Sequence, residues 1–394
     1  MTSNPVLIQP FVTDLFKKTI TELQKEPQFN RYSPLYAVSN GDPSIKVAVG
    51  NVPLNYDLWK GLRNPGRIGL YPAGLKEIWE FYAHRSIDAV DASGRPTIFQ
   101  VPVSFQNACT EYKRAVLISV MLPFAPDIVT QYINTVEDNL SSSHLFTQIY
   151  NTVDTILDTA CTRVAHYLVH NDTVVVPMNN QNVSSLSAEA IPLTRQNDSH
   201  GPSKGGNYPQ KSLAVLLGLG QLGVHRIVFR DEIKSGKVHR YIGPLRSIIV
   251  FDKNDVTTDG LIIINEKWRK FLFKLFDYTN TNPDINKYRF CTYIPLNDQG
   301  CGLCTEYCPS GAQPNSMPLP TGKYSTEVSH QNHRFWEGVL QFDHARCCQK
   351  RGQMKSMFPE WSCARGLSVC ASKGKKRKDA VQNFYEKMDQ LTSG

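Results

Sequence analysis

The segment 301–309 reads CGLCTEYCP, and its three cysteines decide how the C-terminal third of the chain is interpreted. The chain has ten cysteines, and only Cys109 and Cys161 precede residue 290. The other eight lie within 80 residues and are Cys291, Cys301, Cys304, Cys308, Cys347, Cys348, Cys363 and Cys370. We read no export signal at the N-terminus, and the cytosol keeps thiols reduced rather than paired in disulfides. We therefore expect a cytoplasmic protein whose clustered cysteines bind metal.

The spacing of these cysteines favours iron–sulfur clusters over zinc. Cys301, Cys304 and Cys308, with Pro309 after them, have the spacing of the last three cysteines of a bacterial ferredoxin run. Zinc sites, the alternative, prefer two separated cysteine pairs and do not need a proline after the last cysteine. Eight thiolates also equal the number that two [4Fe–4S] clusters need. The sequence therefore predicts two [4Fe–4S] clusters held by the eight cysteines.

The division of the cysteines between the two clusters is a separate hypothesis. Asp298 stands where the first cysteine of the ferredoxin run belongs, so Cys291 must replace it or Asp298 must itself be a ligand. The pair Cys347 and Cys348 can complete the second set. We assign one cluster to Cys291, Cys301, Cys304 and Cys370, and the other to Cys308, Cys347, Cys348 and Cys363.

Upstream of the cysteines, apolar patterns predict a layered domain of mixed helices and strands. Residues 147–170 carry apolar side chains at helical spacing, and the run AVLISVM at 115–121 is typical of a buried strand. Further strands are predicted at 173–176, 245–251 and 261–264, and further helices at 7–23, 75–84, 210–217 and 266–278. The alternation of elements favours an α/β or α+β fold over residues 110–270.

A length of 394 residues exceeds what one small core needs, so we expect several parts. They are an N-terminal region of unknown role (1–105), an α/β core (106–285), a double-cluster domain (286–372) and a basic C-terminal helix or tail (373–394). The tail contains much of the net charge of +8 in its run KGKKRK, which is either a solvated tail or a docking patch for an acidic electron donor or a nucleic acid. No apolar run approaches the roughly 18 residues that span a bilayer, so we predict no membrane span.

Three glycines, Gly218, Gly220 and Gly223, have the spacing G-x-G-x-x-G. A dinucleotide site with this spacing follows a strand and opens a helix. Here the preceding segment 210–217 has the pattern of a helix rather than a strand. A nicotinamide or flavin site, a plain structural turn and a third interpretation all remain open.

The third interpretation is a family resemblance. The segments KSLAVLLGLGQLGVHR (211–226) and YIGPLR (241–246), followed by the cysteine region, resemble the reductive dehalogenases and the related epoxyqueuosine reductases. The resemblance covers roughly residues 110–371. It implies an α+β chain with a nitroreductase-like layered core that binds cobalamin base-off, followed by a ferredoxin-like domain with two clusters. It also implies a small-molecule substrate and an external electron donor such as ferredoxin or flavodoxin.

Site residues follow from the same resemblance. Gly218, Gly220 and Gly223 would let the backbone lie against the corrin, and Arg226 and Arg246 would bind a phosphate or another anion. Asp198 and Tyr208 are the candidate proton donors, because they precede the glycine turn. Two other functions stay open. They are a two-cluster electron-transfer protein without an organic cofactor, and a protein that processes or reduces cobalamin itself.

Overall fold

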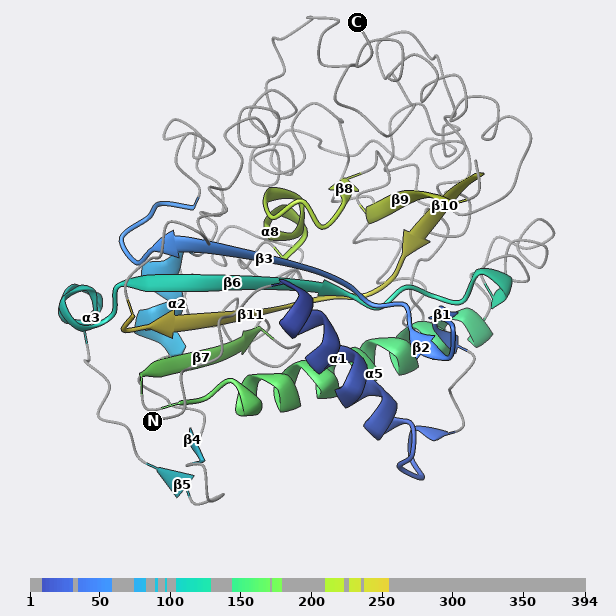
Figure 1. Ribbon diagram of the computed structural model, residues 1–394, viewed down its shortest axis with the longest axis horizontal. Helices are drawn as coiled ribbons and strands as arrows, with labels where there is room; N and C mark the ends of the chain where they lie inside the picture. The colour runs from blue at the N-terminus through green and yellow to red at the C-terminus, as the bar shows by residue number, and fades with distance from the viewer. Residues whose placement is uncertain are drawn as a thin grey trace, which may run out of the picture.

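The protein is described by a computed structural model, and its placed residues form a layered α+β core (Figure 1). The residues described are 9–30, 35–58, 74–82, 89–90, 96–97, 104–128, 144–170, 172–178, 210–222, 227–234 and 237–254. The predicted elements at 261–264 and 266–278, the cluster domain and the basic tail lie outside these ranges.

A four-stranded antiparallel sheet with the order β3–β6–β11–β7 is the centre of the core. The strands are β3 (Lys46–Pro53), β6 (Arg114–Met121), β11 (Leu245–Asp252) and β7 (Thr173–Met178). The two central strands are buried on both faces, which explains their continuous apolar sequences. Ile118 of β6 lies opposite Ile248 of β11, and this register places alternate residues on opposite faces.

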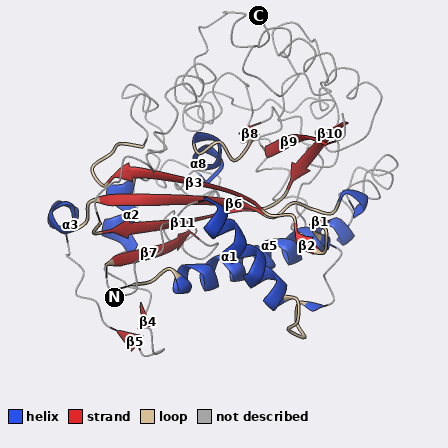
Figure 2. Ribbon diagram, in the orientation of Figure 1, coloured by secondary structure: helices blue, strands red, loops and turns tan. Residues whose placement is uncertain are grey.

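Two helices cover the first face of the sheet (Figure 2). They are α1 (Gln9–Leu23) and α5 (His144–Tyr167), which pack against each other; in this view α1 crosses in front of the sheet and α5 runs below it. Both helices bury an apolar stripe against the strands, as the helical spacing of α5 predicts. The buried residues of this layer include Phe16, Ile20, Val153, Leu157, Ile118 and Ile248.

Three shorter helices supply the second face: α2 (Leu75–Tyr82), α3 (Phe105–Glu111) and α8 (Gln210–Leu216). Trp79 of α2 is fully buried, and its ring meets Phe251 of β11 edge-on with centroids 5.0 Å apart. Leu117 and Ile249 point to this layer, because they alternate with the residues that face α5. The sheet therefore separates two hydrophobic cores.

A second sheet, with the order β10–β9–β8, adjoins α8 (Figure 1). Its strands are β8 (Gln221–Leu222), β9 (Val228–Lys234) and β10 (Lys237–Ile242). Only Gly243 and Pro244 separate β10 from β11, and a Cβ at Gly243 would collide with the carbonyl of Leu122. Two short strand pairs complete the described elements: β1 (Val38–Ser39) with β2 (Asp42–Pro43), and β4 (Ala89–Val90) with β5 (Pro96–Thr97).

The predicted elements that fall within the described ranges are confirmed with small shifts of their ends. Helices are present as α1, α2, α5 and α8, and strands as β6, β7 and β11. The sequence did not predict β3, which pairs with β6 along its whole length. Hence β3, from the region 1–105, belongs to the same sheet as strands of the region 106–285. α1, also from the region 1–105, packs in the same hydrophobic core as α5. The nitroreductase-like and ferredoxin-like folds stay predictions.

None of the helices within the described ranges has both the length and the apolar character needed to cross a membrane.

Candidate functional site

The glycine turn of the sequence motif ends helix α8. Gly218 has a φ of 74°, its N–H donates to the carbonyl of Val215, and the N–H of Leu219 donates to the carbonyl of Ala214. This pair of bonds is a Schellman C-cap, in which a glycine in the left-handed region closes the helix. Leu219 and Ala214 are both fully buried, and such an apolar contact accompanies the motif. The first glycine is thus explained by helix termination.

Gly220 has a different reason to lack a side chain. A Cβ at this position would lie 2.5 Å from the carbonyl oxygen of Phe229 and 2.9 Å from Cγ1 of Val228. Both residues belong to β9, so the backbone of the neighbouring strand occupies the space beside Gly220. Gly218, by contrast, is exposed and has no atom within 4 Å of its Cβ position. Of these two glycines, only Gly218 leaves room for a ligand.

The order of elements around the motif also argues against a dinucleotide site. Such a site places its glycines between a strand and the start of a helix. Here Gly218 and Gly220 come after α8 and before β8, so the turn ends a helix instead of opening one. The nicotinamide or flavin interpretation has no support in this local geometry.

Charged side chains gather on one face of the β9–β10 hairpin, and one of them reaches the glycine turn. Arg230 on β9 donates from Nε to Oε1 of Glu232 at 3.1 Å, and its Nη1 lies 3.5 Å from the carbonyl of Leu219. Lys46, at the start of β3, places its Nζ 2.8 Å from the same Oε1. Its ammonium also lies 4.1 Å from the ring centroid of Tyr241. These four side chains, Lys46, Arg230, Glu232 and Tyr241, are called the hairpin cluster below.

The other face of the hairpin carries an internal ion pair. Asp231 and Arg240 lie opposite each other on β9 and β10, and the guanidinium binds both carboxylate oxygens, at 2.8 and 2.6 Å. Both side chains are almost completely buried, and Arg240 also stacks 3.9 Å from the ring centroid of Phe229. The two hydrogen bonds and the stacked ring offset the free-energy cost of removing both charged groups from water. This ion pair therefore joins the two strands of the hairpin.

Arg246, a predicted anion ligand, has its anions within the protein. Its Nε donates to Oδ1 of Asp158 at 2.5 Å, and its Nη2 lies 2.7 Å from Oδ2 of Asp154. Both carboxylates belong to α5, and the arginine side chain is only 5% exposed. An external phosphate would have to displace one of these carboxylates. We therefore assign Arg246 a structural role, joining β11 to α5, and leave it out of the ligand site.

Burial and charge act in opposite directions on this arginine. Burial alone would lower the pKa of Arg246, but the carboxylates of Asp154 and Asp158 outweigh it and raise the pKa above its ordinary value. Cys161 lies on the same helix, fully buried, with its Sγ 3.6 Å from the carbonyl of Ser247. Burial raises the pKa of this thiol, so Cys161 is protonated and unreactive at neutral pH. Cys161 is thus part of the hydrophobic core between α5 and the sheet.

Two buried hydroxyls lie side by side in the sheet. Ser119 on β6 and Ser247 on β11 are paired in the register and fully buried. They alternate with the residues that face α5, so they point toward the layer of α8. Within the described part of the chain, neither hydroxyl oxygen has a hydrogen-bond partner.

Most of the sequence-predicted site residues lie outside the described ranges. They are Asp198, Tyr208, Gly223, Arg226 and the eight cysteines from Cys291 to Cys370. Among the residues that are described, no group of three or more histidine, cysteine or acidic side chains is arranged to hold a metal ion. The two-cluster prediction therefore stays a prediction.

The hairpin cluster was missed by the sequence analysis. Its members come from β3, β9 and β10, and the region of β3 carried no predicted role. The only local signal is the order Arg230-Asp231-Glu232, in which strand alternation sends the arginine and the glutamate to one face and the aspartate to the other.

Comparison of the chain with protein-family models, with curated proteins and with solved structures gives no match in any of the three.

Proposed function

We propose that the chain is a cobalamin-dependent iron–sulfur reductase, which passes electrons through two [4Fe–4S] clusters to a bound corrinoid and on to a small organic substrate. The observation that carries the proposal is the segment CGLCTEYCP with five further cysteines nearby, placed after a glycine turn and a Gly-Pro-x-Arg segment that leads into a strand. This order of parts resembles the reductive dehalogenases and the epoxyqueuosine reductases. The described helix–turn–strand segment around Gly218 is compatible with that resemblance.

The fit of a corrinoid to the described residues rests on Gly218. The residue is exposed, and the space where a Cβ would lie is open to 4 Å. A flat macrocycle can approach the backbone more closely at such a glycine than at any other residue type. Gly220 adds nothing to this fit, because β9 fills the space beside it.

The residues of the chain have defined roles in this proposal. The eight cysteines hold the clusters, and Gly218 admits the macrocycle to the turn. When bound, the corrinoid supplies cobalt chemistry that reduces the substrate with electrons from the clusters. Asp198 or Tyr208 holds the proton that the substrate receives, because a carboxyl or a phenol can act as a general acid.

A second candidate, a two-cluster electron carrier without an organic cofactor, has one specific observation in its favour. Gly220 and Arg246, both predicted to touch the corrinoid, are each explained by contacts within the protein. The clusters alone would then account for the cysteine pattern.

Electron transfer to cobalamin tests the proposal. The full chain, with clusters reconstituted without air, is mixed with cobalamin and reduced flavodoxin, and the corrinoid spectrum is followed. We expect rapid corrinoid reduction with the wild-type chain and with Cys109→Ser, whose thiol is half-buried in the layered core. Cys301→Ser should reduce it far more slowly, because it loses a cluster ligand. Equal rates for both variants would contradict the proposal.

A further inference from the structure

Arg230 has hydrogen-bond donors left over at the glycine turn. A guanidinium has five N–H donors. Among the described residues, the partners of Arg230 are one oxygen of Glu232 and, at the long distance of 3.5 Å, the carbonyl of Leu219. The Arg230 side chain is 34% exposed. An arginine with unused donors can bind an oxyanion through two parallel hydrogen bonds.

The hairpin cluster also has an excess of positive charge. Lys46 and Arg230 share a single carboxylate, and both bind its Oε1. The nearest other acidic residue on the hairpin, Asp231, points to the opposite face and is bound there by Arg240. The side chains of Lys46, Arg230 and Glu232 together carry a net charge of +1.

Arg230 lies next to the glycine turn, where a ligand could approach it. The carbonyl that its Nη1 approaches belongs to Leu219, between the exposed Gly218 and the buried Gly220. A glycine beside an arginine with unused donors leaves room for a bulky group. Lys46 is only 12% exposed and is oriented by Glu232 and the ring of Tyr241, so it acts mainly through its charge.

We propose that the hairpin cluster binds an oxyanion of the phosphate class at the glycine turn, with Arg230 as the direct ligand and Lys46 as a supporting charge. The site takes the role that the sequence assigned to Arg246. The site shares Gly218 with the proposed corrinoid contact, but none of the cysteines that would hold the clusters belongs to it.

Binding of inorganic phosphate to the full chain, measured by calorimetry at low ionic strength, tests the site. Arg230→Gln is expected to weaken binding about tenfold, the loss of a charge-assisted bidentate contact. Arg230→Lys keeps the charge but not the fork, so its loss should be smaller. Glu232→Gln should tighten binding, because it removes the competing carboxylate.

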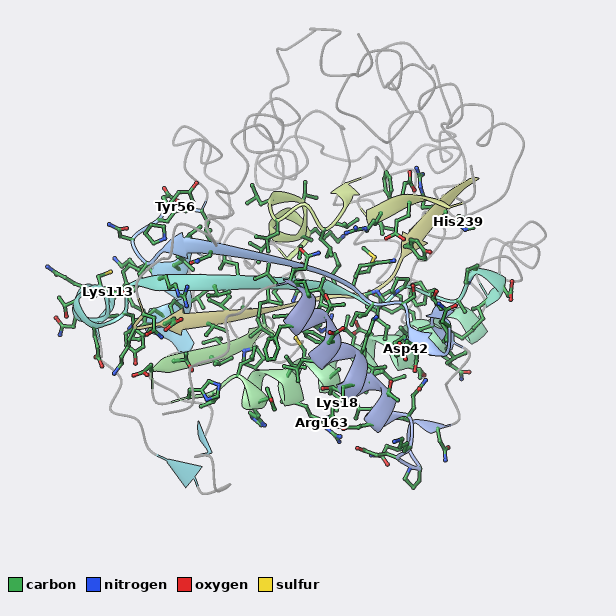
Figure 3. All side chains as sticks on the ribbon, viewed as in Figure 1. Lys18, Asp42, Tyr56, Lys113, Arg163 and His239 are labelled. Carbon is green, nitrogen blue, oxygen red and sulfur yellow. The ribbon has the colours of Figure 1, made fainter. Side chains whose placement is uncertain are left out.

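The matched control is Lys18→Gln. Figure 3 shows Lys18 on α1, and this exposed residue belongs to neither β9 nor β10. It also changes the net charge by one unit, and it should leave binding unchanged. Equal losses in Arg230→Gln and Lys18→Gln would overturn the proposal, and so would wild-type protein that does not bind phosphate. If Arg230→Gln does not fold, the Arg230→Lys and Lys18→Gln comparison decides in the same way.

Two further probes identify the source of the phosphate group. Dimethyl phosphate represents the phosphodiester of a nucleotide-bearing cofactor, and methyl phosphate represents a phosphorylated substrate. Preference for either probe, lost in Arg230→Gln, supports the site and names its ligand. Binding of neither overturns it. These measurements need no iron and no cobalamin, so their failure is distinguishable from failure of the proposed reductase function.

Discussion

Arg246 on β11 donates from Nε to Oδ1 of Asp158 on α5 across 2.5 Å, and this contact joins the central sheet to its longest helix. Asp154, one helical turn earlier, binds the same guanidinium. Because the arginine side chain is 5% exposed, its removal leaves a buried space and two partly buried carboxylates, 15% and 26% exposed, without their counter-charge. The contact therefore stabilises the folded state.

Arg246→Met should lower the free energy of unfolding by about 3–5 kcal/mol, the cost of breaking a buried pair from one side. The control is Arg163→Met, which breaks the surface pair between Arg163, labelled in Figure 3, and Glu26. Arg163 is 44% exposed, so this change should cost at most about 1 kcal/mol. Urea unfolding of both variants checks the difference, and equal losses would contradict the structural role of Arg246.

Stability should fall at alkaline pH. Burial raises the pKa of Cys161 and of Tyr36, and raises that of Tyr112 to about 12, whereas the ordinary values are 9.0 for the thiol and 10.0 for the phenols. Above pH 9 the folded state therefore keeps protons that the unfolded chain loses. The stabilisation is complete below pH 9 and decreases as the pH rises, by about 1.4 kcal/mol per pH unit for each group in its window.

Cys161 and Cys109, whose pKa burial also raises, set the start of this decrease. In a Cys109→Ser background, Cys161→Ala is expected to be less stable at neutral pH, because it leaves a small cavity, but its stability should begin to fall nearer pH 10 than pH 9. Unfolding by urea at a series of pH values measures the onset. An onset that does not move would show that Cys161 is not the buried protonated group.

Removal of the paired hydroxyls of Ser119 and Ser247 should not destabilise the sheet. A buried hydroxyl without a partner costs free energy, so each change to alanine is expected to be neutral or to stabilise by up to about 1 kcal/mol. Thr173→Val is the control, since the buried Thr173 hydroxyl accepts from His170 N–H at 2.9 Å and lies 3.1 Å from the Leu168 carbonyl. That change should cost about 1 kcal/mol. Clear losses in both serine variants would mean that the hydroxyls bind a group deep in the second layer.

The two described glycines should respond differently to substitution. Gly218→Ala is expected to cost about 1–2 kcal/mol through the left-handed backbone alone, and Gly218→Asn less, because asparagine tolerates this conformation. Gly220→Ala should cost about 1–3 kcal/mol, because its Cβ would press on the backbone of β9. Thermal unfolding compares the three variants. Similar costs for alanine and asparagine at residue 218 would contradict its assignment as a helix cap.

The asparagine variant also tests the cofactor contact. Gly218→Asn keeps the helix cap but places a side chain in the open space at the turn. If a corrinoid lies there, the variant should bind less cobalamin than wild-type protein while it unfolds at a similar temperature. Unchanged cobalamin binding would remove Gly218 from the site.

The sequence predicts those elements whose pattern is local. The strand β6 reads as a continuous apolar run because both of its faces are buried, and α5 reads as a helix because its stripe repeats at helical spacing. β3 was missed because Gly50, Asn51 and Pro53 are poor strand residues. The structure explains Gly50, since a Cβ there would collide with Leu217 after α8. That contact is tertiary, and no local pattern reveals it.

The candidate site was predicted less well, for the same physical reason. The sequence does not show which residues will form ion pairs. Asp158 lies 88 residues before its partner Arg246, and only the fold brings Lys46 to Glu232. The pattern of residues 210–217 predicted the helix, but the glycine spacing left three interpretations open, and the described geometry serves the helix end and the packing of β9. The cysteine pattern needs no such contacts to be recognised, because the ligand spacing itself carries the chemistry.

The metal content of the full chain tests the central claim most directly. The protein is produced with cobalamin supplied, purified without air, and analysed for iron, zinc and cobalt together with its visible spectrum. The account predicts about eight iron atoms and about one cobalt per chain, as two four-iron clusters and one corrinoid require. Iron at that level without cobalt would contradict the cobalamin claim and leave the electron carrier, and zinc in place of iron would contradict the cluster assignment itself.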